Sequence, residues 1–329
     1  MFIIKVRNGI GNQLFIYAFG EYLKKYYPSE EIKYDFSDLP YYVNGRYTRC
    51  FTDIVDDAKV LEPFEVRKHL GKSLYYHRLK SNDRNFLHRI ERKIVNSIVF
   101  KKEYNLVEEP SNVDELNSFF LETKMIDELK QNNDCVFDGF WEDIRYVEPV
   151  KAQIRNKVTF RNTAINKRYE ELVTEGETVA VHIRRKDYIK ESFDSNYPKY
   201  FYAFCDEEYY KEAINIISKN VSNPVFLFFS DDVEYAKKTF YYLPNKEFIE
   251  NQTDIEDLFL MTQCKHHIIA NSTFSFWGAF LSNKGGITVA PNIHYIYAVD
   301  NCNTTTKIYF QIPQWRYIDV SDRASIIGV

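Results

Sequence analysis

The chain has 329 residues, of which 45% are hydrophobic and 27% charged, and its formal net charge is −4 at pH 7. This ordinary globular composition excludes a disordered chain, and the length is sufficient for two domains with separate cores. Because a weakly acidic chain has no overall positive field, nucleic acid is excluded as an expected partner. Aromatic residues make up 17% of the chain; we assign most of them to the core, although sugar and nucleobase sites also use aromatic faces.

Cysteine usage and the N-terminus indicate the compartment. The five cysteines are Cys50, Cys135, Cys205, Cys264 and Cys302. Their odd number and wide spacing favour reduced thiols in a cytoplasmic protein over a disulfide framework or a zinc site. The first residues, MFIIKVRNG, lack the apolar run of a signal peptide, and no stretch of about 18 apolar residues follows. The basic segment 78–102 is either a contact with the inner membrane surface or a solvated helix face.

The chain opens with a strand, a glycine-bearing loop and a helix. Residues 2–6 are an apolar run that predicts a strand, and residues 7–13 predict a loop. Residues 14–26 have apolar side chains at helical spacing. This order is typical of a nucleotide-binding half, but Leu14 stands where the third glycine of G-x-G-x-x-G is required, so the dinucleotide fingerprint is incomplete.

Two polar segments of the first half are candidates for contact with a sugar. Asn12 and Gln13 offer amide groups, and Gly11 lets the backbone approach a ligand. The alternative is a tight βα turn whose amides bond locally. Trp141, at the end of a second predicted strand, is either a sugar-stacking wall beside Asp143 or a core residue.

We place a domain junction near residue 155, which divides the chain into domains 1–155 and 156–329. In the second domain, strands are predicted at 178–183, 224–229, 247–250, 267–270 and, as the last strand, 287–291. Helices are predicted at 207–219, 233–240, 254–264 and 274–281. This regular alternation indicates an α/β domain with a parallel sheet.

Three of these strands end in polar clusters, at 182–187, 230–232 and 271–275. In a doubly wound sheet the carboxyl ends of the strands share one crevice. The paired guanidinium groups of Arg184 and Arg185 suit phosphate, and Asn-Ser-Thr before a helix presents a positive helix end to an anion. Together the clusters predict a pyrophosphate clamp. Taken singly, the arginine cluster could be a surface charge cluster, and Asn-Ser-Thr could be an ordinary helix N-cap.

The same segments offer two apparent metal motifs, neither of which we assign. Asp232 and Glu234 form an Asp-x-Glu, but both suit the first turn of a helix. Asp231 is the better candidate for a ligand role, accepting hydrogen bonds from a nucleoside. His266 and His267 are adjacent, so on a strand they would point to opposite faces, which favours structural roles.

Four blocks carry a resemblance to a known family. Residues 9–19 are similar to G-x-G-N-Q-x-F-x-Y-A, and residues 137–143 to G-[YF]-[FW]-[QE]. Residues 182–188 are similar to H-x-R-R-x-D-Y, and residues 264–279 to C-K-H-x-I-x-A-N-S-[ST]-[FY]-S-W-W-[GA]-A. Together these blocks resemble the bacterial α-1,2-fucosyltransferases of glycosyltransferase family 11.

This resemblance implies an α/β fold of the GT-B type, with two Rossmann-like domains facing across a cleft. It implies an N-terminal acceptor domain, a C-terminal domain that binds GDP-fucose, and an inverting reaction without metal or cofactor. The expected acceptor is the 2-hydroxyl of a terminal β-galactose in O-antigen or another surface polysaccharide. Lys186 replaces the family's usual Gly and Phe276 the first of two Trp, so the acceptor is less constrained than the donor. An α-1,6- or protein O-fucosyltransferase and a non-catalytic nucleotide- or glycan-binding protein are the alternatives.

The resemblance also implies residue roles. Arg184 and His182 are expected to stabilise charge on the β-phosphate. Asp187 is expected to be the general base, with Glu191 and Asp143 in reserve. The expected donor-binding residues are His182, Arg184, Arg185, Ser230, Asp231, Asn271, Ser272, Thr273 and Ser275. On the acceptor side the candidates are Gly11, Asn12, Gln13, Trp141 and Asp143.

Overall fold

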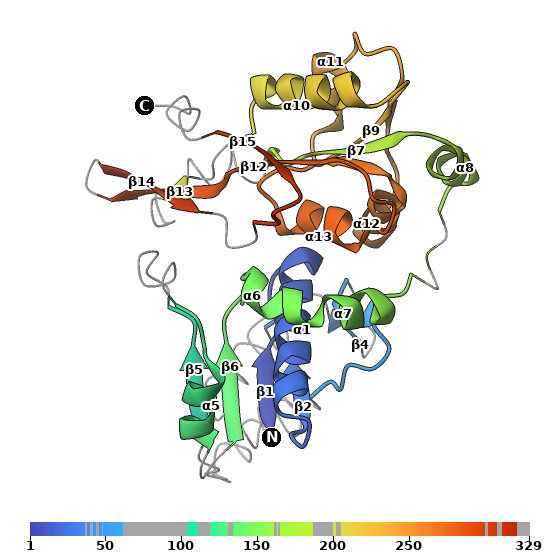
Figure 1. The fold of residues 1–329 in the computed structure, drawn as a ribbon. Helices are drawn as coiled ribbons and strands as arrows, with labels where there is room; N and C mark the ends of the chain where they lie inside the picture. Colours follow the sequence, from blue (N-terminus) through green and yellow to red (C-terminus); the bar gives the residue numbers. More distant parts are fainter. Residues whose placement is uncertain are drawn as a thin grey trace, which may run out of the picture. The chain divides into compact units, whose positions relative to one another are not determined.

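The computed structural model describes residues 1–36, 38–39, 42–43, 46–47, 49–61, 104–110, 119–130, 134–160, 163, 165–186, 200–201, 205–299, 302–307 and 311–320. Asp187, Glu191 and the basic segment 78–102 lie outside these residues. The chain forms two compact units, residues 1–159 and 160–329, whereas the sequence placed the junction at 155. Each unit has its own parallel sheet flanked by helices (Figure 1), which confirms the predicted α/β class with two Rossmann-like units.

The sheet of the first unit has four parallel strands in the order β2-β1-β6-β5. Its larger elements are β1 (Phe2–Lys5), α1 (Ile10–Tyr26), β2 (Ile32–Asp35), β5 (Tyr104–Glu108), α5 (Thr123–Lys130) and β6 (Asp134–Asp138). The shorter ones are β3 (Tyr42–Val43), β4 (Arg46–Tyr47), α6 (Ile144–Val147), α7 (Lys151–Lys157) and the 3-10 turns η1 (Phe51–Asp53) and η2 (Glu148–Val150). Every residue of β1 is buried, because the strand lies inside the sheet.

Helix α1 begins four residues earlier than the sequence predicts. Gly9 is its N-cap residue, and the N–H of Gln13 donates to the Gly9 carbonyl over 3.1 Å, which is the first helical hydrogen bond. Gly11, Asn12 and Gln13 therefore lie in the first turn of the helix and not in a loop. The sequence predicted a later helix start because glycine is a poor helix former. In the structure Gly11 is buried within the first unit, and this packing compensates for its low helix propensity.

Aromatic rings form much of the core of the first unit. Trp141 stacks on Phe19 with ring centroids 4.1 Å apart and an interplanar angle of 6°. Phe137 and Tyr146 meet Phe19 edge to face. Truncating one such ring to alanine typically costs about 3–5 kcal/mol. In this unit the high aromatic content therefore serves packing.

The sheet of the second unit has six parallel strands in the order β10-β9-β7-β11-β12-β15. These strands are β7 (Thr178–Ile183), β9 (Val225–Ser230), β10 (Lys246–Phe248), β11 (His266–Ile268), β12 (Thr288–Pro291) and β15 (Arg316–Ile318). The helices are α8 (Lys167–Glu175), α10 (Glu207–Asn220), α11 (Val233–Thr239), α12 (Asp254–Gln263) and α13 (Thr273–Leu281). A separate antiparallel sheet contains β8 (Tyr200–Phe201), β13 (Ile293–Val299) and β14 (Cys302–Lys307). The last predicted strand is therefore followed by three more.

Alternating side chains of β7 divide the second unit into two layers of helices. Val179, Val181 and Ile183 point into the core that α10 and α11 cover. Ala180 points to the opposite core, which α8 and α12 cover. Figure 1 shows α10 and α11 on one side of the sheet and α12 and α13 on the other.

Two remaining observations concern cysteines and membranes. Cys50, Cys135, Cys205 and Cys264 form no disulfide within the described part of the chain. Of the helices within the described ranges, none combines the length and the apolar character needed to cross a bilayer.

Candidate functional site

The strand order of the second unit reverses between β7 and β11. From β7 the chain passes to β9 and β10 on one side, and afterwards to β11, β12 and β15 on the other. Open α/β sheets bind ligands outside the carboxyl ends of the strands at such a switch point. Ile183 pairs with Ser230 at the ends of β7 and β9, and Ile268 of β11 pairs with Val181. The described residues of the three polar clusters therefore lie at the carboxyl ends of neighbouring strands, as predicted.

Asp231 holds the turn that follows β7. Its carboxylate oxygens accept hydrogen bonds from the backbone N–H groups of Arg185 (2.9 Å) and Lys186 (3.1 Å). Its Oδ2 also lies 3.7 Å from Nε of Arg184. The sequence predicted that Asp231 accepts hydrogen bonds from a nucleoside, but in the structure both of its carboxylate oxygens accept hydrogen bonds from backbone N–H groups of the protein. We therefore treat Asp231 as a residue that positions the arginine turn.

The two arginines of this turn have different surroundings. The guanidinium of Arg185 lies 4.0 Å from the ring centroid of Tyr235 on α11, and its Nε lies 3.6 Å from Oδ2 of Asp232. Asp232 is the N-cap of α11, as predicted, and its N–H donates to Oγ of Ser230 (2.9 Å). Arg185 therefore supports local structure in this conformation, although the sequence placed it among the donor-binding residues. The two side chains are about equally exposed, at 35% for Arg184 and 36% for Arg185, so the ring contact and ion pair of Arg185 with α11, and not its exposure, make Arg184 the better candidate to meet a ligand.

His182 is buried in β7, with its ring centroid 5.5 Å from that of Phe274. Desolvation, together with the nearby Arg184 guanidinium, lowers the pKa of His182 to about 3. The imidazole is therefore neutral at physiological pH and cannot supply the positive charge that the sequence assigned to it. Its Nδ1 has no hydrogen-bond partner among the described residues, so the neutral ring can still bond to a ligand or a water.

Helix α13 begins just beyond β11 without a side-chain cap. Ser272 occupies the N-cap position with an extended backbone, but its side chain makes no capping hydrogen bond. Ser275, which the sequence assigned to the donor, is fully buried, and its Oγ donates to the Ser272 carbonyl (3.2 Å). Asn271 and Thr273 are also buried. What this end of the helix offers an anion is its first-turn N–H groups and its positive dipole.

Two tyrosines of α10 support this edge from the opposite layer. The hydroxyl of Tyr209 donates to the Ile269 carbonyl (2.6 Å), and that of Tyr210 donates to the His182 carbonyl (2.9 Å). These bonds hold the ends of β11 and β7, the two strands at the switch point. The sequence did not reveal them, because paired tyrosines in a helix indicate only a buried face.

Asp257 and Gln252 form a second polar feature of the same edge, and sequence reasoning missed it. The chain leaves the carboxyl end of β10, passes Gln252 and enters α12, so the N-terminus of α12 lies at this edge. Oδ1 of Asp257 and Oε1 of Gln252 are buried and have no hydrogen-bond partner among the described residues. Desolvation, with Asp254 and Glu256 nearby, raises the pKa of Asp257 to about 7. One signal in the sequence could have revealed Asp257. It is a third acidic residue in the first turn of α12, where Thr253 and Glu256 already form the cap.

In the first unit the corresponding switch point lies between β1 and β6 of the described sheet. Gln13 is fully buried, its Nε2 donates to the Asn8 carbonyl (2.7 Å), and its Oε1 accepts from the N–H of Phe51 (3.1 Å). The local-bonding alternative is therefore right for Gln13. Asn12 instead donates from Nδ2 to Oε1 of Glu142 (2.8 Å), and Glu142 was not a predicted site residue.

Three other predicted acceptor residues serve the fold. Trp141 is fully buried against Phe19, so it is a core residue and not a sugar-stacking wall. Asp143 is the N-cap of α6 and accepts from the N–H (2.8 Å) and Nε (2.8 Å) of Arg145. Gly11 is buried in the first turn of α1. Burial and internal bonding keep all three from contact with a sugar in this conformation.

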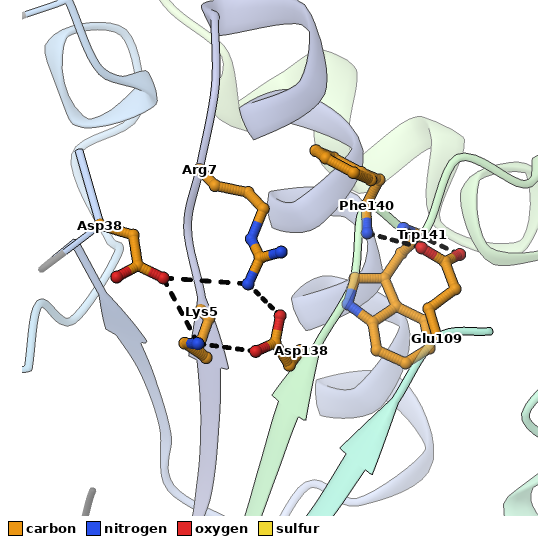
Figure 2. Close-up of polar contacts among 7 residues, drawn as sticks. All are labelled: Lys5, Arg7, Asp38, Glu109, Asp138, Phe140 and Trp141. Carbon is orange, nitrogen blue, oxygen red and sulfur yellow. Dashed lines mark hydrogen bonds and ion pairs between the residues drawn. The ribbon is translucent and has the colours of Figure 1, made fainter. Parts of the chain in front are cut away.

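Figure 2 shows a charged cluster at the same edge. Nζ of Lys5 lies 2.6 Å from Asp138 and 3.3 Å from Asp38, and Arg7 also pairs with both carboxylates. The Arg7 guanidinium lies 5.7 Å from the ring centroid of Phe140. Sequence reasoning missed this cluster, because its members come from three segments up to 133 residues apart.

Glu109 shapes the loop after β6. Its carboxylate accepts from the N–H groups of Phe140 (2.6 Å) and Trp141 (3.2 Å), as Figure 2 shows. Trp141 has a φ of 54°, a backbone conformation that is rare for a large side chain. Gly139 makes the approach possible, since a Cβ there would lie 2.5 Å from Cβ of Glu109.

The two adjacent histidines have the structural roles that the sequence favours. Nδ1 of His266 accepts from the N–H of Ile287 (2.9 Å), and its Nε2 lies 2.9 Å from Glu177. Nε2 of His267 lies 2.8 Å from the Met261 carbonyl. Over the described ranges, no three His, Cys, Asp or Glu side chains are grouped so that they could hold a metal ion.

Comparison with known proteins places these features among glycosyltransferases. The profile described as Glycosyl transferase family 11 matches residues 1–319. An Escherichia coli protein named Alpha-1,2-colitosyltransferase is 39% identical over 162 residues, which cover 47% of this chain and 54% of that protein. A second Escherichia coli protein, O-antigen biosynthesis glycosyltransferase WbnK, is 28% identical over 309 residues, 86% of this chain and 91% of that protein.

More distant similarities extend to a mouse enzyme and to a solved structure. Galactoside 2-alpha-L-fucosyltransferase Sec1 of Mus musculus is 32% identical over 116 residues, 34% of this chain and 30% of that protein. The crystal structure of fucosyltransferase NodZ from Bradyrhizobium aligns with 93% of this chain and 98% of that chain, with a TM-score of 0.49 and 16% identity. The aligned region thus spans about half of the first relative, nearly all of the second and under a third of the mouse enzyme.

Proposed function

Because the chain belongs to glycosyl transferase family 11, we propose that it transfers L-fucose from GDP-fucose to the 2-hydroxyl of a terminal β-galactoside. The name of the mouse relative supports the galactoside acceptor and the 2-linkage. The name of the relative that matches over most of both chains supports a role in O-antigen synthesis. The proposed acceptor is therefore an oligosaccharide of a bacterial surface polysaccharide.

The observation that carries this proposal is that Arg184 and the N-terminus of α13 follow the adjacent parallel strands β7 and β11 at the switch point. A diphosphate needs several donors and compensating positive charge. The guanidinium supplies a planar fork, and the helix supplies N–H groups and a positive dipole end. Asp231 stabilises the turn that carries Arg184 by accepting two backbone hydrogen bonds. We assign the diphosphate of the donor to this edge.

Asp257 and Gln252 support guanine as the base of that donor. The Watson–Crick edge of guanine presents N–H donors from N1 and N2, whereas the same edge of adenine presents one donor and one acceptor. Two buried oxygens without partners among the described residues suit the guanine edge. In the ligand complex their desolvation would be compensated by hydrogen bonds. This pair is the proposed source of base specificity.

The proposed reaction is a displacement with inversion at the anomeric carbon of fucose. The acceptor oxygen forms the new bond while the bond from the anomeric carbon to the β-phosphate oxygen breaks, and GDP leaves with the electron pair. Arg184 and the α13 N–H groups stabilise the charge that develops on the leaving phosphate. His182, being neutral, contributes a hydrogen bond and no charge. Metal independence is part of the proposal and is tested below with a chelator.

A second donor is favoured by one observation, the 39% identity with an α-1,2-colitosyltransferase. Colitose is fucose without its 3-hydroxyl group, so GDP-colitose would place the same diphosphate and base at the same edge. The two donors differ only at one hydroxyl of the sugar. A site built to hydrogen-bond a hydroxyl rejects an analogue that lacks it by several orders of magnitude, so the ratio of kcat/KM values for the two donors decides between them.

Transfer from labelled GDP-fucose to a panel of β-galactosides, with EDTA present, tests the proposal. Product linkage is read by NMR, which distinguishes a 2-linked from a 6-linked fucose. We expect 2-linked product with wild type and little with Arg184→Ala. Transfer to the 6-hydroxyl or to protein would favour the alternative fucosyltransferases. Binding of GDP-fucose without transfer to any acceptor, with GDP-colitose also inactive, would favour a non-catalytic protein.

A further inference from the structure

The carboxyl edge of the described sheet in the first unit contains polar groups that the proposed donor site does not use. Asn12 stands in the first turn of α1, directly after β1, and Glu142 follows β6. Nδ2 of Asn12 donates to Oε1 of Glu142 over 2.8 Å. Since β1 and β6 are adjacent parallel strands with β2 on the far side of β1, these groups lie at the position where α/β sheets bind ligands.

We propose that this edge of the first unit binds a neutral pyranose, with Glu142 accepting hydrogen bonds from sugar hydroxyls and the indole N–H of Trp141 donating to a sugar oxygen. The inference rests on the function proposed above, because the sugar would be the terminal residue of the glycan acceptor. Asn12 engages Oε1 of Glu142, which is the hydrogen bond that the described part of the chain makes to this carboxylate. The side chain of Glu142 is half-buried, so Oε2 is left for a ligand.

The indole of Trp141 points independently to a ligand. Its Nε1 is fully buried and has no hydrogen-bond partner among the described residues. A buried N–H without an acceptor costs free energy that a ligand oxygen would recover. Figure 2 shows the nitrogen-bearing edge of this indole turned toward Asp138 and Arg7. The ring faces stay in the core, so the sugar would meet the nitrogen edge of Trp141 and not its ring face.

Arg7 is the side chain that would have to shift to admit the sugar. It is 28% exposed, and its Nε is buried with no hydrogen-bond partner in the described ranges, so its bonding is incomplete in the free protein. Its guanidinium lies 5.7 Å from the ring centroid of Phe140, which is half-buried. A shift of Arg7 would open the indole edge of Trp141, and the Phe140 ring would offer an apolar face on which a pyranose can stack.

The charges at this edge favour a neutral ligand. The cluster in Figure 2 has two cations and two carboxylates, which cancel: Lys5, Arg7, Asp38 and Asp138. Glu109 and Glu142 add further carboxyl groups, so an anionic ligand would be repelled. A sugar hydroxyl carries no charge, and it can donate to a carboxylate and accept from an N–H at the same time. This combination of groups therefore suits a neutral polyol.

The ionisation of Glu142 gives sugar binding a pH dependence. Desolvation, followed by the Glu109 carboxylate beyond β5, raises the pKa of Glu142 to about 8. Burial raises the pKa of Glu109 as well, with Asp143 adding to the rise and Arg7 opposing it. Asp143 itself is paired with Arg145. Because a carboxylate accepts a hydrogen bond more strongly than a neutral carboxyl group does, sugar affinity should rise as Glu142 ionises.

The experiment titrates methyl β-galactoside into the full chain without nucleotide and follows the indole N–H signals of its three tryptophans by NMR. Trp141→Phe, which lacks the nitrogen, identifies the Trp141 signal. Glu142→Gln and Glu142→Asp are compared with Glu108→Gln, the matched control, because Glu108 is an exposed glutamate at the end of the neighbouring strand β5. The methyl β-galacturonoside tests the preference for a neutral sugar. Thermal unfolding identifies a variant that does not fold; if this is Trp141→Phe, the Glu142 variants decide the outcome.

We expect the signal that is absent from Trp141→Phe to move when the galactoside is added, and the galacturonoside to bind about 10-fold more weakly or worse. Wild-type affinity should rise about fivefold between pH 6 and pH 9. Glu142→Gln should bind about 10-fold more weakly at pH 9 and lose the pH dependence. Glu142→Asp should recover part of the affinity, and Glu108→Gln should match wild type.

Two results would overturn the inference: a Trp141 signal that does not respond to the galactoside, or wild-type affinity and pH dependence in Glu142→Gln. Because these titrations contain no nucleotide, they are independent of the donor site. A parallel titration of the same protein with GDP separates the two proposals. Galactoside binding without GDP binding would support the sugar site and contradict the proposed transfer, whereas GDP binding without galactoside binding would contradict the sugar site alone.

Discussion

Replacing Asp257 by asparagine should make the free protein more stable while weakening nucleotide binding. The carboxyl group is half-buried at the start of α12, where Oδ1 has no partner among the described residues. Its pKa rises from 3.8 to about 7. Because the folded state disfavours the carboxylate, ionisation at neutral pH opposes folding. The amide has nearly the same shape and carries no charge.

The magnitude follows from linkage. A rise of about three units, at about 1.4 kcal/mol each, sets an upper limit of about 4 kcal/mol. Since the carboxyl group is only half-buried, solvent screening reduces this to about 1–2 kcal/mol. The folded pKa lies above the unfolded one, so the penalty is absent below about pH 4, grows between about pH 4 and 7, and is constant above. Asp257→Asn should therefore gain stability as the pH rises.

Urea unfolding from pH 4.5 to 8.5, together with GDP titration, checks both halves of this prediction. We expect a gain of about 1–2 kcal/mol at pH 8 that disappears toward pH 4.5, and GDP binding weaker by about 10- to 100-fold. Asp254→Asn, in the same helix turn, removes a favourable helix-end charge but also one of the charges that disfavour ionised Asp257, so it should change stability by less than about 1 kcal/mol. A less stable Asp257→Asn at pH 8, or wild-type GDP affinity, would refute the reasoning.

Two further substitutions test how the edge is built. Asp231→Asn leaves one of the two N–H groups of the Arg185 turn without an acceptor, so we expect a loss of about 1–2 kcal/mol in urea unfolding and weaker GDP binding; unchanged values for both would mean that the turn does not depend on this carboxylate. Gly278→Ala places a Cβ 2.9 Å from Cβ of Met261 where α13 packs on α12, and overpacking should cost about 1–3 kcal/mol. Wild-type stability of the Gly278→Ala variant would contradict this prediction, because it would mean that α13 and α12 move apart at no cost to make room for the added Cβ.

The second unit was predictable because its signals are local. The prediction of 178–183 matches β7 residue for residue, since a short β-branched run fully buried in a parallel sheet has a distinctive pattern. Asp206, Asp232 and Thr253 all act as N-caps at the starts of their helices, so the helix starts could be found to within a residue. The shared location of the polar clusters then followed from the alternation of strands and helices, whereas the strand order that makes β7/β11 the switch point came from the structure.

The features that escaped prediction depend on contacts between distant segments. Gln13 is structural because Phe51, 38 residues away, donates to its side chain. Trp141 lies in the core with a positive φ, and its N–H donates to Glu109, 32 residues away. The role of Asp257 depends on the burial of one oxygen at the start of α12. The spacing of residues along the chain does not predict any of these contacts.

The central claim is that the edge formed by β7, β11 and α13 binds the diphosphate of a guanosine diphosphate sugar through Arg184. Calorimetric titration of GDP into wild type and Arg184→Ala, with EDTA in both, tests it most directly. The account predicts that GDP binds wild type despite the chelator, that ADP and UDP bind more weakly, and that Arg184→Ala loses about 10- to 100-fold in affinity. A folded wild type that does not bind GDP, or equal affinity in Arg184→Ala, would contradict it.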